Sequence, residues 1–170
     1  MDIRAYGKVL IIYLVLVLFQ VMVFNNINIG TWGITPLFYV LFVLVLPFET
    51  PSWALLLMSF VMGYTIDVFC DTPGLNAGAS VAMAYARTHV LNIIQPRDGY
   101  ESGLRPYLMD MGIEWFFRYS ISLVLIHHLV YFVFDEFGFS HFFKTMGQII
   151  ITTAVTEAFI IISQYITFRK

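Results

Sequence analysis

Long runs of apolar residues without charge constrain this chain more than any other feature of its sequence. Residues 9–27 contain no charged side chain, and residues 146–168 contain one, Glu157. Because a helix rises about 1.5 Å per residue and the hydrocarbon core of a bilayer is about 30 Å thick, about 20 apolar residues cross it. Hydrophobic residues make up 59% of the 170 positions and charged ones 12%, which leaves too little polar surface for a water-soluble globule. We therefore expect an integral membrane protein.

Six segments reach or approach the length of a membrane span, so we expect an all-α, polytopic protein with six transmembrane helices in one bundle. They are residues 9–27, 30–47, 52–69, 75–94, 112–134 and 146–168. The second is short, because the stretch between Pro36 and Pro47 covers only about half a bilayer at about 1.5 Å per residue. No loop is long enough for a separate soluble domain. Residues 1–170 are therefore expected to form a single membrane domain.

Lysines and arginines outside the predicted spans fall almost entirely on one side of the membrane. If the N-terminus is cytoplasmic, Lys144 is the only one on the outer side. The inner side then holds Arg4, Lys8, Arg97, Arg105, Arg169 and Lys170. Cytoplasmic loops carry an excess of these residues. We therefore expect both termini and the loop around residue 100 to be cytoplasmic, and the corner around residue 72 to lie outside.

A short polar corner and a string of small residues follow the third predicted span, in the stretch "CDTPGLNAGAS". Asp71, Thr72 and Pro73 are typical of a turn that also caps the next helix. Small residues then recur at every fourth position, a spacing that makes a groove where another backbone can approach closely. They are Gly74, Gly78, Ala82 and Ala86. We expect this groove to pack against another helix of the same chain rather than in a dimer, because a central helix needs such a groove.

Ionisable side chains inside the predicted spans need partners, because an isolated charge in hydrocarbon costs a few kcal/mol even on the mildest scales. Glu114 and Arg118 are four residues apart on one helix, in the favourable order for an ion pair. Arg87 falls in the same half of the membrane, and Glu157 lies near the middle of the last span. We expect an arginine to hold Glu157.

In the other half of the membrane, Asp67 lies at a depth comparable to that of His127 and His128, so we expect them to meet. Adjacent residues on a helix point about 100° apart, so at most one of the two histidines joins an interior network and the doublet cannot hold one metal ion. The polar groups fit either a proton or ion path or a set of interhelical contacts that fix the packing. We favour packing, because no repeated or broken-helix pattern of a transporter is visible.

Motifs of known catalytic sites are missing from the sequence. It contains no G-x-S-x-G, H-E-x-x-H, G-x-G-x-x-G or Walker loop, and Cys70 is its only cysteine. Asp67 and Asp71 lie on one helix end, whereas an aspartyl protease needs carboxylates from two elements around a shared water. We therefore expect no enzyme activity, no cofactor, no metal site and no nucleic-acid partner.

Two stretches carry a family resemblance. They are "TPLFYVLFVLVLPFETPSWALLLMSFVMGYTIDVFCDTPGLNAGASVAMAYARTHVLNIIQPRDGY" and, downstream, "LIHHLVYFVFDEFGF". A proline-bounded second span, an outer "D-x-x-x-D-T-P-G" corner, a small-residue helix and an inner "PRDGYE" occur in that order. The ensemble resembles the rod shape-determining protein MreD family, in the form found in the Bacteroidetes, and covers about residues 34–165.

The resemblance implies a non-catalytic scaffold of the bacterial cell-elongation (rod) complex, a multi-pass protein of the inner membrane that helps to maintain cell shape. Its implied partners are an MreC-like bitopic membrane protein and, indirectly, MreB, RodA and a class B penicillin-binding protein of peptidoglycan synthesis. The family fold is similar to the substrate-binding subunits of energy-coupling-factor transporters, so a small-molecule-binding transporter subunit is the alternative function. A lipid-handling protein, with a hydrophilic groove through the inner arginines, is a third.

Carried onto this chain, the resemblance implies two regions of contact with partners. The outer region consists of Asp67, Asp71 and Pro73. The inner region consists of Arg97, Asp98, Gly99 and Tyr100. We expect the outer corner to be the stronger candidate, because Asp67 lies close enough to the apolar region to need a partner.

Overall fold

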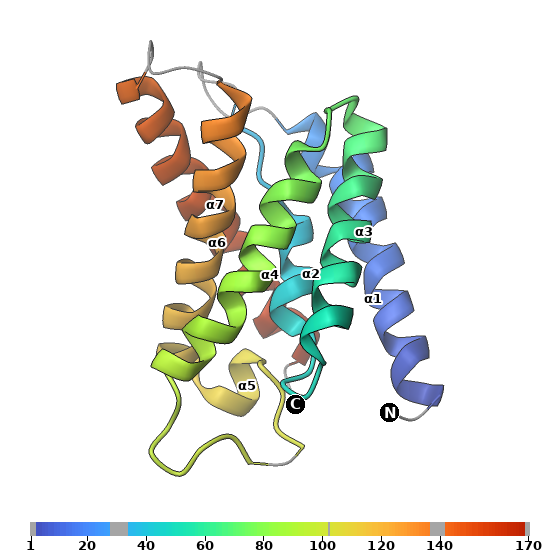
Figure 1. Ribbon diagram of the computed structural model, residues 1–170, viewed down its shortest axis with the longest axis vertical. Coiled ribbons are helices and arrows are strands. Elements are labelled where there is room, and N and C mark those ends of the chain that lie inside the picture. Colours follow the sequence, from blue (N-terminus) through green and yellow to red (C-terminus); the bar gives the residue numbers. More distant parts are fainter. Residues whose placement is uncertain (1–2, 28–33, 102, 137–141, 169–170) are drawn as a thin grey trace.

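A computed structural model describes residues 3–27, 34–101, 103–136 and 142–168, and every regular element within these ranges is helical (Figure 1). Five helices are long and four elements are short. The long helices are α1 (Ile3–Met22), α3 (Ser52–Cys70), α4 (Leu75–Ile93), α6 (Ile113–Asp135) and α7 (Phe142–Phe168). The short elements are α2 (Leu41–Val45), α5 (Leu108–Met111) and the 3-10 helices η1 (Phe24–Asn26) and η2 (Phe38–Val40).

Four helical segments have the length and apolar composition needed to cross a membrane: Gly7–Asn26, Ser52–Cys70, Ile113–Asp135 and Phe142–Thr167. The α4 helix is also long, at 19 residues, but its small and polar residues make it less apolar than these four. The all-helical expectation is confirmed, whereas six spans are not. The expected second span, residues 30–47, is not a long helix in its described part. Its residues 30–33 lie outside the described part of the chain.

The second segment is an irregular chain followed by η2 and the five-residue helix α2, not one continuous helix. Every residue from 37 to 46 is buried. The segment contacts α1, α3, α4 and α7, which together enclose it. Irregular backbone is tolerated at membrane depth only when it is buried in protein, because no lipid group can bond the free N–H and C=O groups. An uncharged run of large apolar residues meets that condition, and it fills the centre of the bundle.

The long helices pack as neighbours that are antiparallel from α3 to α4, α6 and α7, whereas α1 runs parallel to α3. The α4 helix packs against α3 on one side and α6 on the other, α6 packs against α7, and α1 packs against α3. The start of α1 and the end of α7 lie at the same end of the bundle, together with α5 and the loop before it (Figure 1). The corner between α3 and α4 lies at the opposite end.

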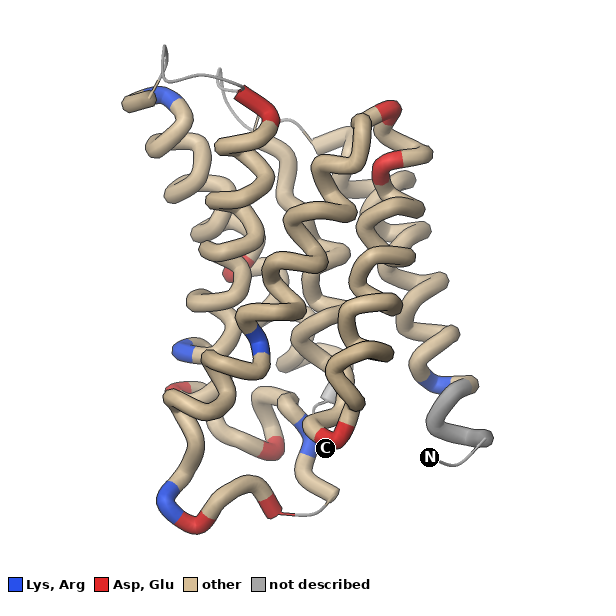
Figure 2. The backbone as a smooth tube through the Cα atoms, in the orientation of Figure 1, with Lys and Arg blue, Asp and Glu red and all other residues tan. Residues whose placement is uncertain are grey.

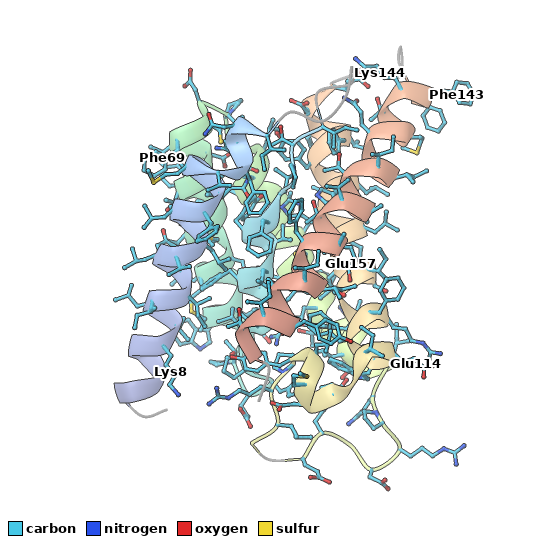
Figure 3. The ribbon with its side chains drawn as sticks, turned by 180° about the vertical axis from the view of Figure 1, so that it is seen from behind. Lys8, Phe69, Glu114, Phe143, Lys144 and Glu157 are labelled. Carbon is cyan, nitrogen blue, oxygen red and sulfur yellow. The ribbon has the colours of Figure 1, made fainter. Side chains whose placement is uncertain are left out.

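Charged residues divide unequally between the two ends. Most lysines and arginines of the described chain lie in the half that holds the start of α1 and the end of α7 (Figure 2). Lys8 is in that half, whereas Lys144 is at the opposite end (Figure 3). Acidic residues occur at both ends. The bias is the one that the positive-inside rule associates with the cytoplasmic face.

The polarity of the bundle is reversed relative to that of a water-soluble protein. Large apolar side chains point outward, including Phe69 at 60% exposure and Phe143 at 89% (Figure 3). Many polar side chains are instead buried between the helices. Among them are Gln20, Asp67, Asn76, Arg87, His127, His128, Thr156 and Glu157. This arrangement suits a bilayer, in which apolar surface is solvated by lipid and polar groups must find partners inside the protein.

Candidate functional site

The corner between α3 and α4 is held by one carboxylate. Asp71 ends α3 in the left-handed conformation (φ 55°), so the chain reverses within a few residues and the first turn of α4 lies beside the last turn of α3. The Oδ1 atom of Asp67 accepts hydrogen bonds from the Asn76 backbone N–H (3.0 Å) and the Thr72 hydroxyl (2.5 Å). Its Oδ2 atom accepts one from the Ala77 N–H (2.8 Å). An anion at this position offsets both the free N–H groups and the positive dipole end of α4.

This contact corrects two sequence predictions. Asp67 does not meet His127 or His128 directly, because the N-terminus of α4 occupies its carboxylate. The cap of α4 also comes from α3, rather than from Asp71 and Thr72: Asp71 is exposed, and Gly74, the residue before the helix, makes no side-chain cap. Pro73 is exposed at the tip of the corner.

A chain of buried hydrogen bonds nevertheless connects Asp67 to His127. The Asn76 Nδ2 group donates to the Asp67 carboxylate (3.0 Å), so the Asn76 Oδ1 atom faces the other way and accepts from the Tyr39 hydroxyl (2.8 Å). The single hydroxyl hydrogen of Tyr39 is thereby used. The Nε2 atom of His127, 2.8 Å from the same oxygen, must therefore carry a hydrogen and donate it. The carboxylate at the corner thus sets the direction of every bond as far as His127.

Both histidines are fully buried, which makes the expectation that at most one joins the interior wrong. His128 bonds through Nδ1 to the Thr153 hydroxyl of α7 (2.9 Å), while His127 turns toward Tyr39. Their rings are 5.5 Å apart and nearly perpendicular, as expected for adjacent helical residues. The expected divergence of the two rings is correct, but α6 has neighbours on both sides, so each ring finds a partner.

Arg87 is the largest fully buried side chain near the other end of the bundle, and it caps the short helix α2. Its guanidinium donates to the backbone oxygens of Leu46 (2.5 Å) and Pro47 (3.4 Å), and its Nε group donates to the Tyr119 hydroxyl (2.6 Å). Tyr119 in turn donates to the Leu44 oxygen (3.1 Å). The carbonyl groups at the end of a helix carry partial negative charge and lack helical partners, so a cation here satisfies both. Arg87 is therefore not the arginine that the sequence analysis expected to hold Glu157.

The beginning of the second segment is bonded in a corresponding way. The Gln20 side chain of α1 donates to the Pro36 oxygen (3.0 Å) and accepts from the Tyr39 N–H (3.2 Å). The Thr156 hydroxyl of α7 accepts from the Leu37 N–H (3.1 Å). Side chains from distant elements thus replace the bonds that a continuous helix would make within itself.

The remaining predicted intramembrane charges separate into a buried group and a surface pair. Glu157 is 3% exposed and bonded to the Ser120 hydroxyl, while its Oε2 atom has no hydrogen-bond partner within the described chain. Glu114 and Arg118 form the expected ion pair (2.7 Å). Both of these side chains are mostly exposed, so the pair lies on the outside of α6 and not in an interior network.

The small-residue groove also differs from its prediction. A Cβ atom added at Gly74 or Gly78 would meet nothing within 4 Å, so these glycines face outward instead of packing against another helix of the chain. The close helix approach occurs at Gly63 of α3, where a Cβ would lie 2.4 Å from the Asn76 oxygen and 2.6 Å from the Ala77 Cα. Gly63 lies one helical turn before Asp67 in the sequence. A glycine at that spacing from a polar corner is the sequence feature that could have indicated the close approach of the two helices.

Gly74 and Gly78 line an open groove of about 790 Å³ between α3 and α4, which we call the α3–α4 groove. Its walls are mainly aromatic and aliphatic, with Asp71 and Thr72 at the corner end. The lining comprises Phe60, Tyr64, Asp67, Val68, Asp71, Thr72, Pro73, Gly74, Ala77, Gly78 and Val81. Ala82 and Ala86, the next small residues along α4, are half-buried and outside this lining.

The inner loop is a turn anchored by one aromatic residue. Arg97 and Asp98 are exposed at its tip, and Gly99 has a positive φ of 78° with its N–H bonded to the Pro96 oxygen. The Tyr100 hydroxyl donates to the Leu91 oxygen (2.8 Å), and burial raises the pKa of this phenol. Its ring also stacks on Phe48, at a centroid distance of 4.4 Å. The loop thus presents Arg97 and Asp98 outward, whereas Tyr100 fixes its base.

Within the described ranges, no three His, Cys, Asp or Glu side chains are grouped so as to hold a metal ion. Comparisons with protein families, curated proteins and solved structures found no match to this chain. A functional proposal therefore rests on the arrangement of the residues together with the features of the sequence.

Proposed function

We propose that this chain is a non-catalytic scaffold of the bacterial cytoplasmic membrane that holds a partner's transmembrane helix in the α3–α4 groove. The partner class is an MreC-like bitopic protein, through which MreB, RodA and a class B penicillin-binding protein of the rod complex would be organised. The choice of partner rests on the resemblance of the sequence to the MreD family. The observation that carries the docking site is the outward-facing pair of glycines in this groove.

Physical chemistry favours a helix as the occupant of this groove. Helices in lipid associate through close packing, and their interfaces are enriched in small residues at four-residue spacing. Gly74 and Gly78 have that spacing and leave the floor of the groove open, while Phe60 and Val68 supply aromatic and aliphatic contact area. Gly78 lies within α4, and a lipid-facing helix does not need a glycine there, because it lowers the stability of the helix by about 0.5–1 kcal/mol relative to alanine. Gly74 precedes the helix with a φ of 84°, a conformation that itself favours glycine.

The distribution of charge supports an orientation for the proposed complex. The start of α1, the end of α7 and the loop with Arg97 and Arg105 lie at one end of the bundle (Figure 2), which we assign to the cytoplasm by the positive-inside rule. The α3–α4 corner then faces the outer side. A bitopic partner with a large outer domain would place its helix beside this corner. Arg97 and Asp98 offer a separate exposed turn to proteins on the cytoplasmic side.

The two other functions considered from the sequence have less support. A small-molecule-binding subunit needs polar groups that line a cavity, but Tyr39, Asn76 and His127 are at most 2% exposed and bond to one another. A lipid-handling protein was expected to use a hydrophilic groove through the inner arginines. Arg87 instead caps α2 in the core, and Arg118 is paired on the surface.

Affinity purification of the tagged protein from its own membranes tests the proposal. Wild-type protein should recover a bitopic membrane protein in stoichiometric amount, with cell-wall synthases in lesser amounts. Gly78→Leu should abolish this recovery without unfolding the chain, because the added side chain enters the groove and meets no residue of the same molecule at its Cβ.

Gly7→Leu is the matched control, since Gly7 is also exposed, also has nothing within 4 Å of an added Cβ, and lies on α1 away from the groove. It should leave recovery unchanged. Equal recovery with wild type and Gly78→Leu would rule out the groove as the docking site. Recovery of an ATPase pair with a coupling membrane subunit would replace the scaffold by the transporter function.

A further inference from the structure

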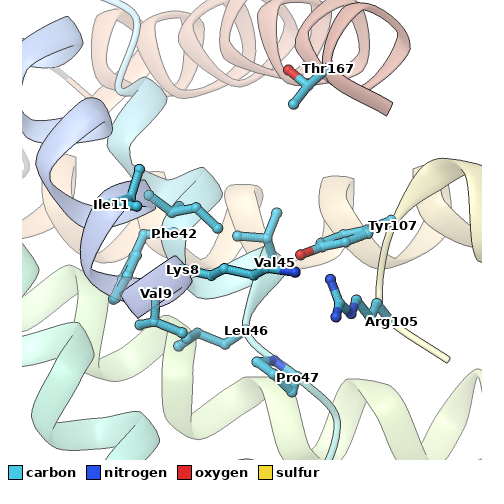
Figure 4. Close-up of a pocket in the computed structure, with 11 residues that line it drawn as sticks. Lys8, Val9, Ile11, Phe42, Val45, Leu46, Pro47, Arg105, Tyr107 and Thr167 are labelled. Atoms are coloured by element: carbon cyan, nitrogen blue, oxygen red, sulfur yellow. The ribbon is translucent and has the colours of Figure 1, made fainter. Parts of the chain in front are cut away.

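A second hollow lies at the other end of the bundle, where α1, the second segment, the loop before α5 and the end of α7 meet (Figure 4). It has a volume of about 360 Å³, and we call it the Lys8–Arg105 pocket. Its walls are apolar, formed largely by Val9, Ile12, Phe42 and Val45. Ile11 at its edge is 62% exposed, so the pocket opens onto the apolar, lipid-facing surface of the bundle.

Among the described residues, two cations are the only charged side chains that line this pocket. Lys8 comes from α1 and Arg105 from the loop before α5, and Figure 4 shows both side chains directed into the same opening. No Asp or Glu is among the lining residues, and neither cation has an ion-pair partner within the described chain. The Arg105 guanidinium lies 5.8 Å from the centre of the Tyr107 ring, which limits where it can point.

We propose that the Lys8–Arg105 pocket binds one anionic phospholipid, with its phosphate between the two cations and the start of an acyl chain against the apolar wall. Two unpaired cations at a depth where the bundle meets headgroups attract an anion, and Arg and Lys both bind phosphate well. A free phosphate would make no use of the apolar wall that continues to the lipid-facing surface at Ile11. A neutral lipid would leave both cations without a counter-charge.

The location of the pocket is consistent with this ligand. The cytoplasmic leaflet carries the anionic lipids, and basic pockets between transmembrane helices on that side bind their headgroups. The Lys8–Arg105 pocket is at the end of the bundle assigned to the cytoplasm, whereas the α3–α4 groove is at the opposite end. Lipid would fill the gap among α1, the second segment and α7, and so join the first helix to the last. The two sites are separate, so a result at one does not decide the other.

Native mass spectrometry of the purified protein in a non-ionic detergent tests this site, with phosphatidylglycerol and phosphatidylcholine titrated in parallel. Wild-type protein should retain one phosphatidylglycerol in preference to phosphatidylcholine. The double variant Lys8→Gln/Arg105→Gln should weaken that binding by about 30-fold, given the usual contribution of each cation near an anionic surface. Both residues are exposed, so the variant should melt like the wild type.

Arg97→Gln/Lys144→Gln is the matched control, because it removes the same two charges from exposed positions outside the pocket. It should bind phosphatidylglycerol as the wild type does. An equal loss in both double variants, or no loss in either, would overturn the proposal. Displacement of the bound lipid by glycerol phosphate at equal concentration would also overturn it, because the pocket would then be a site for a free phosphate.

Discussion

Replacing Gly63 with alanine should force α3 away from α4 at the turn where the two helices are closest. The new Cβ would lie 2.4 Å from the Asn76 oxygen and 2.6 Å from the Ala77 Cα, and both of these are backbone atoms that no side-chain rotation can move. Non-bonded heavy atoms rest at about 3.5–4.0 Å, so the helices must separate locally by about 1 Å. Asp67 is one turn further along α3, and its bonds to the first N–H groups of α4 lengthen with that separation.

The cost of this substitution has three parts. Overpacking in a filled interior costs about 1–3 kcal/mol. Weakening a helix cap adds about 1 kcal/mol, while the better helix propensity of alanine returns about 0.5–1 kcal/mol. The net loss is about 2 kcal/mol, which lowers the ratio of folded to unfolded protein roughly 30-fold.

Unfolding in mixed micelles with a rising fraction of sodium dodecyl sulfate, followed by far-ultraviolet circular dichroism, measures this loss. Gly63→Ala should unfold at a clearly lower fraction of the denaturing detergent than the wild type does. Gly78→Ala is the matched control on the neighbouring helix, where the added Cβ meets nothing within 4 Å. It should be as stable as the wild type or more stable by about 0.5–1 kcal/mol. Wild-type stability of Gly63→Ala, or an equal loss in both variants, would refute the close approach.

Three further substitutions test the buried hydrogen bonds by the same unfolding assay. Asp67→Asn should lose about 1–3 kcal/mol of stability, because its amide group cannot accept every bond that the carboxylate accepts, and partner recovery should weaken. The exposed carboxylate at Asp71 should tolerate the same change within about 0.5 kcal/mol. Similar losses at both positions would contradict the capping role of Asp67. Arg87→Met should lose about 3 kcal/mol or more because the carbonyl groups at the end of α2 are then buried without partners, and an unchanged midpoint would remove Arg87 from that role. Tyr39→Phe should lose about 1–3 kcal/mol, since the hydroxyl joins two buried groups, whereas Tyr85→Phe on the outer surface should be neutral; equal effects would argue against the chain to His127.

The long helices could be predicted from the sequence because each is coded locally. Spans expected at 52–69, 75–94 and 112–134 correspond to Ser52–Cys70, Leu75–Ile93 and Ile113–Asp135. Apolar length, corner residues and prolines determine such boundaries without reference to the rest of the fold. The expected first and last spans also match helices, although α7 begins four residues earlier than predicted, at Phe142.

The second segment could not be predicted, because its path depends on residues far away in the chain. The sequence shows that the stretch between two prolines is too short for a span, but not that it is irregular and central. That shape is stable only because Gln20, Thr156 and Arg87 satisfy its backbone groups from three other helices. The sequence of the segment by itself does not identify these hydrogen-bond partners.

The sequence also does not predict which face of each apolar helix points into the bundle. Depth along the helices predicted that Asp67 and the histidines would meet, but the connection is indirect and runs from Asp67 through Asn76 and Tyr39 to His127. In the same way, the four-residue spacing revealed a stripe of small residues on α4 but not the direction that it faces. An apolar helix gives little indication of its inner face, because lipid and core are both apolar.

Photocrosslinking from within the α3–α4 groove in intact membranes is the most direct test of the scaffold proposal. A photoreactive phenylalanine analogue at Val81, which lines the groove, should give one discrete adduct with a bitopic membrane protein. The same analogue at Leu18, which is 56% exposed on α1, should give no such adduct. The absence of a protein adduct from Val81, or the same set of adducts from both positions, would contradict the proposal that this groove holds a partner's helix.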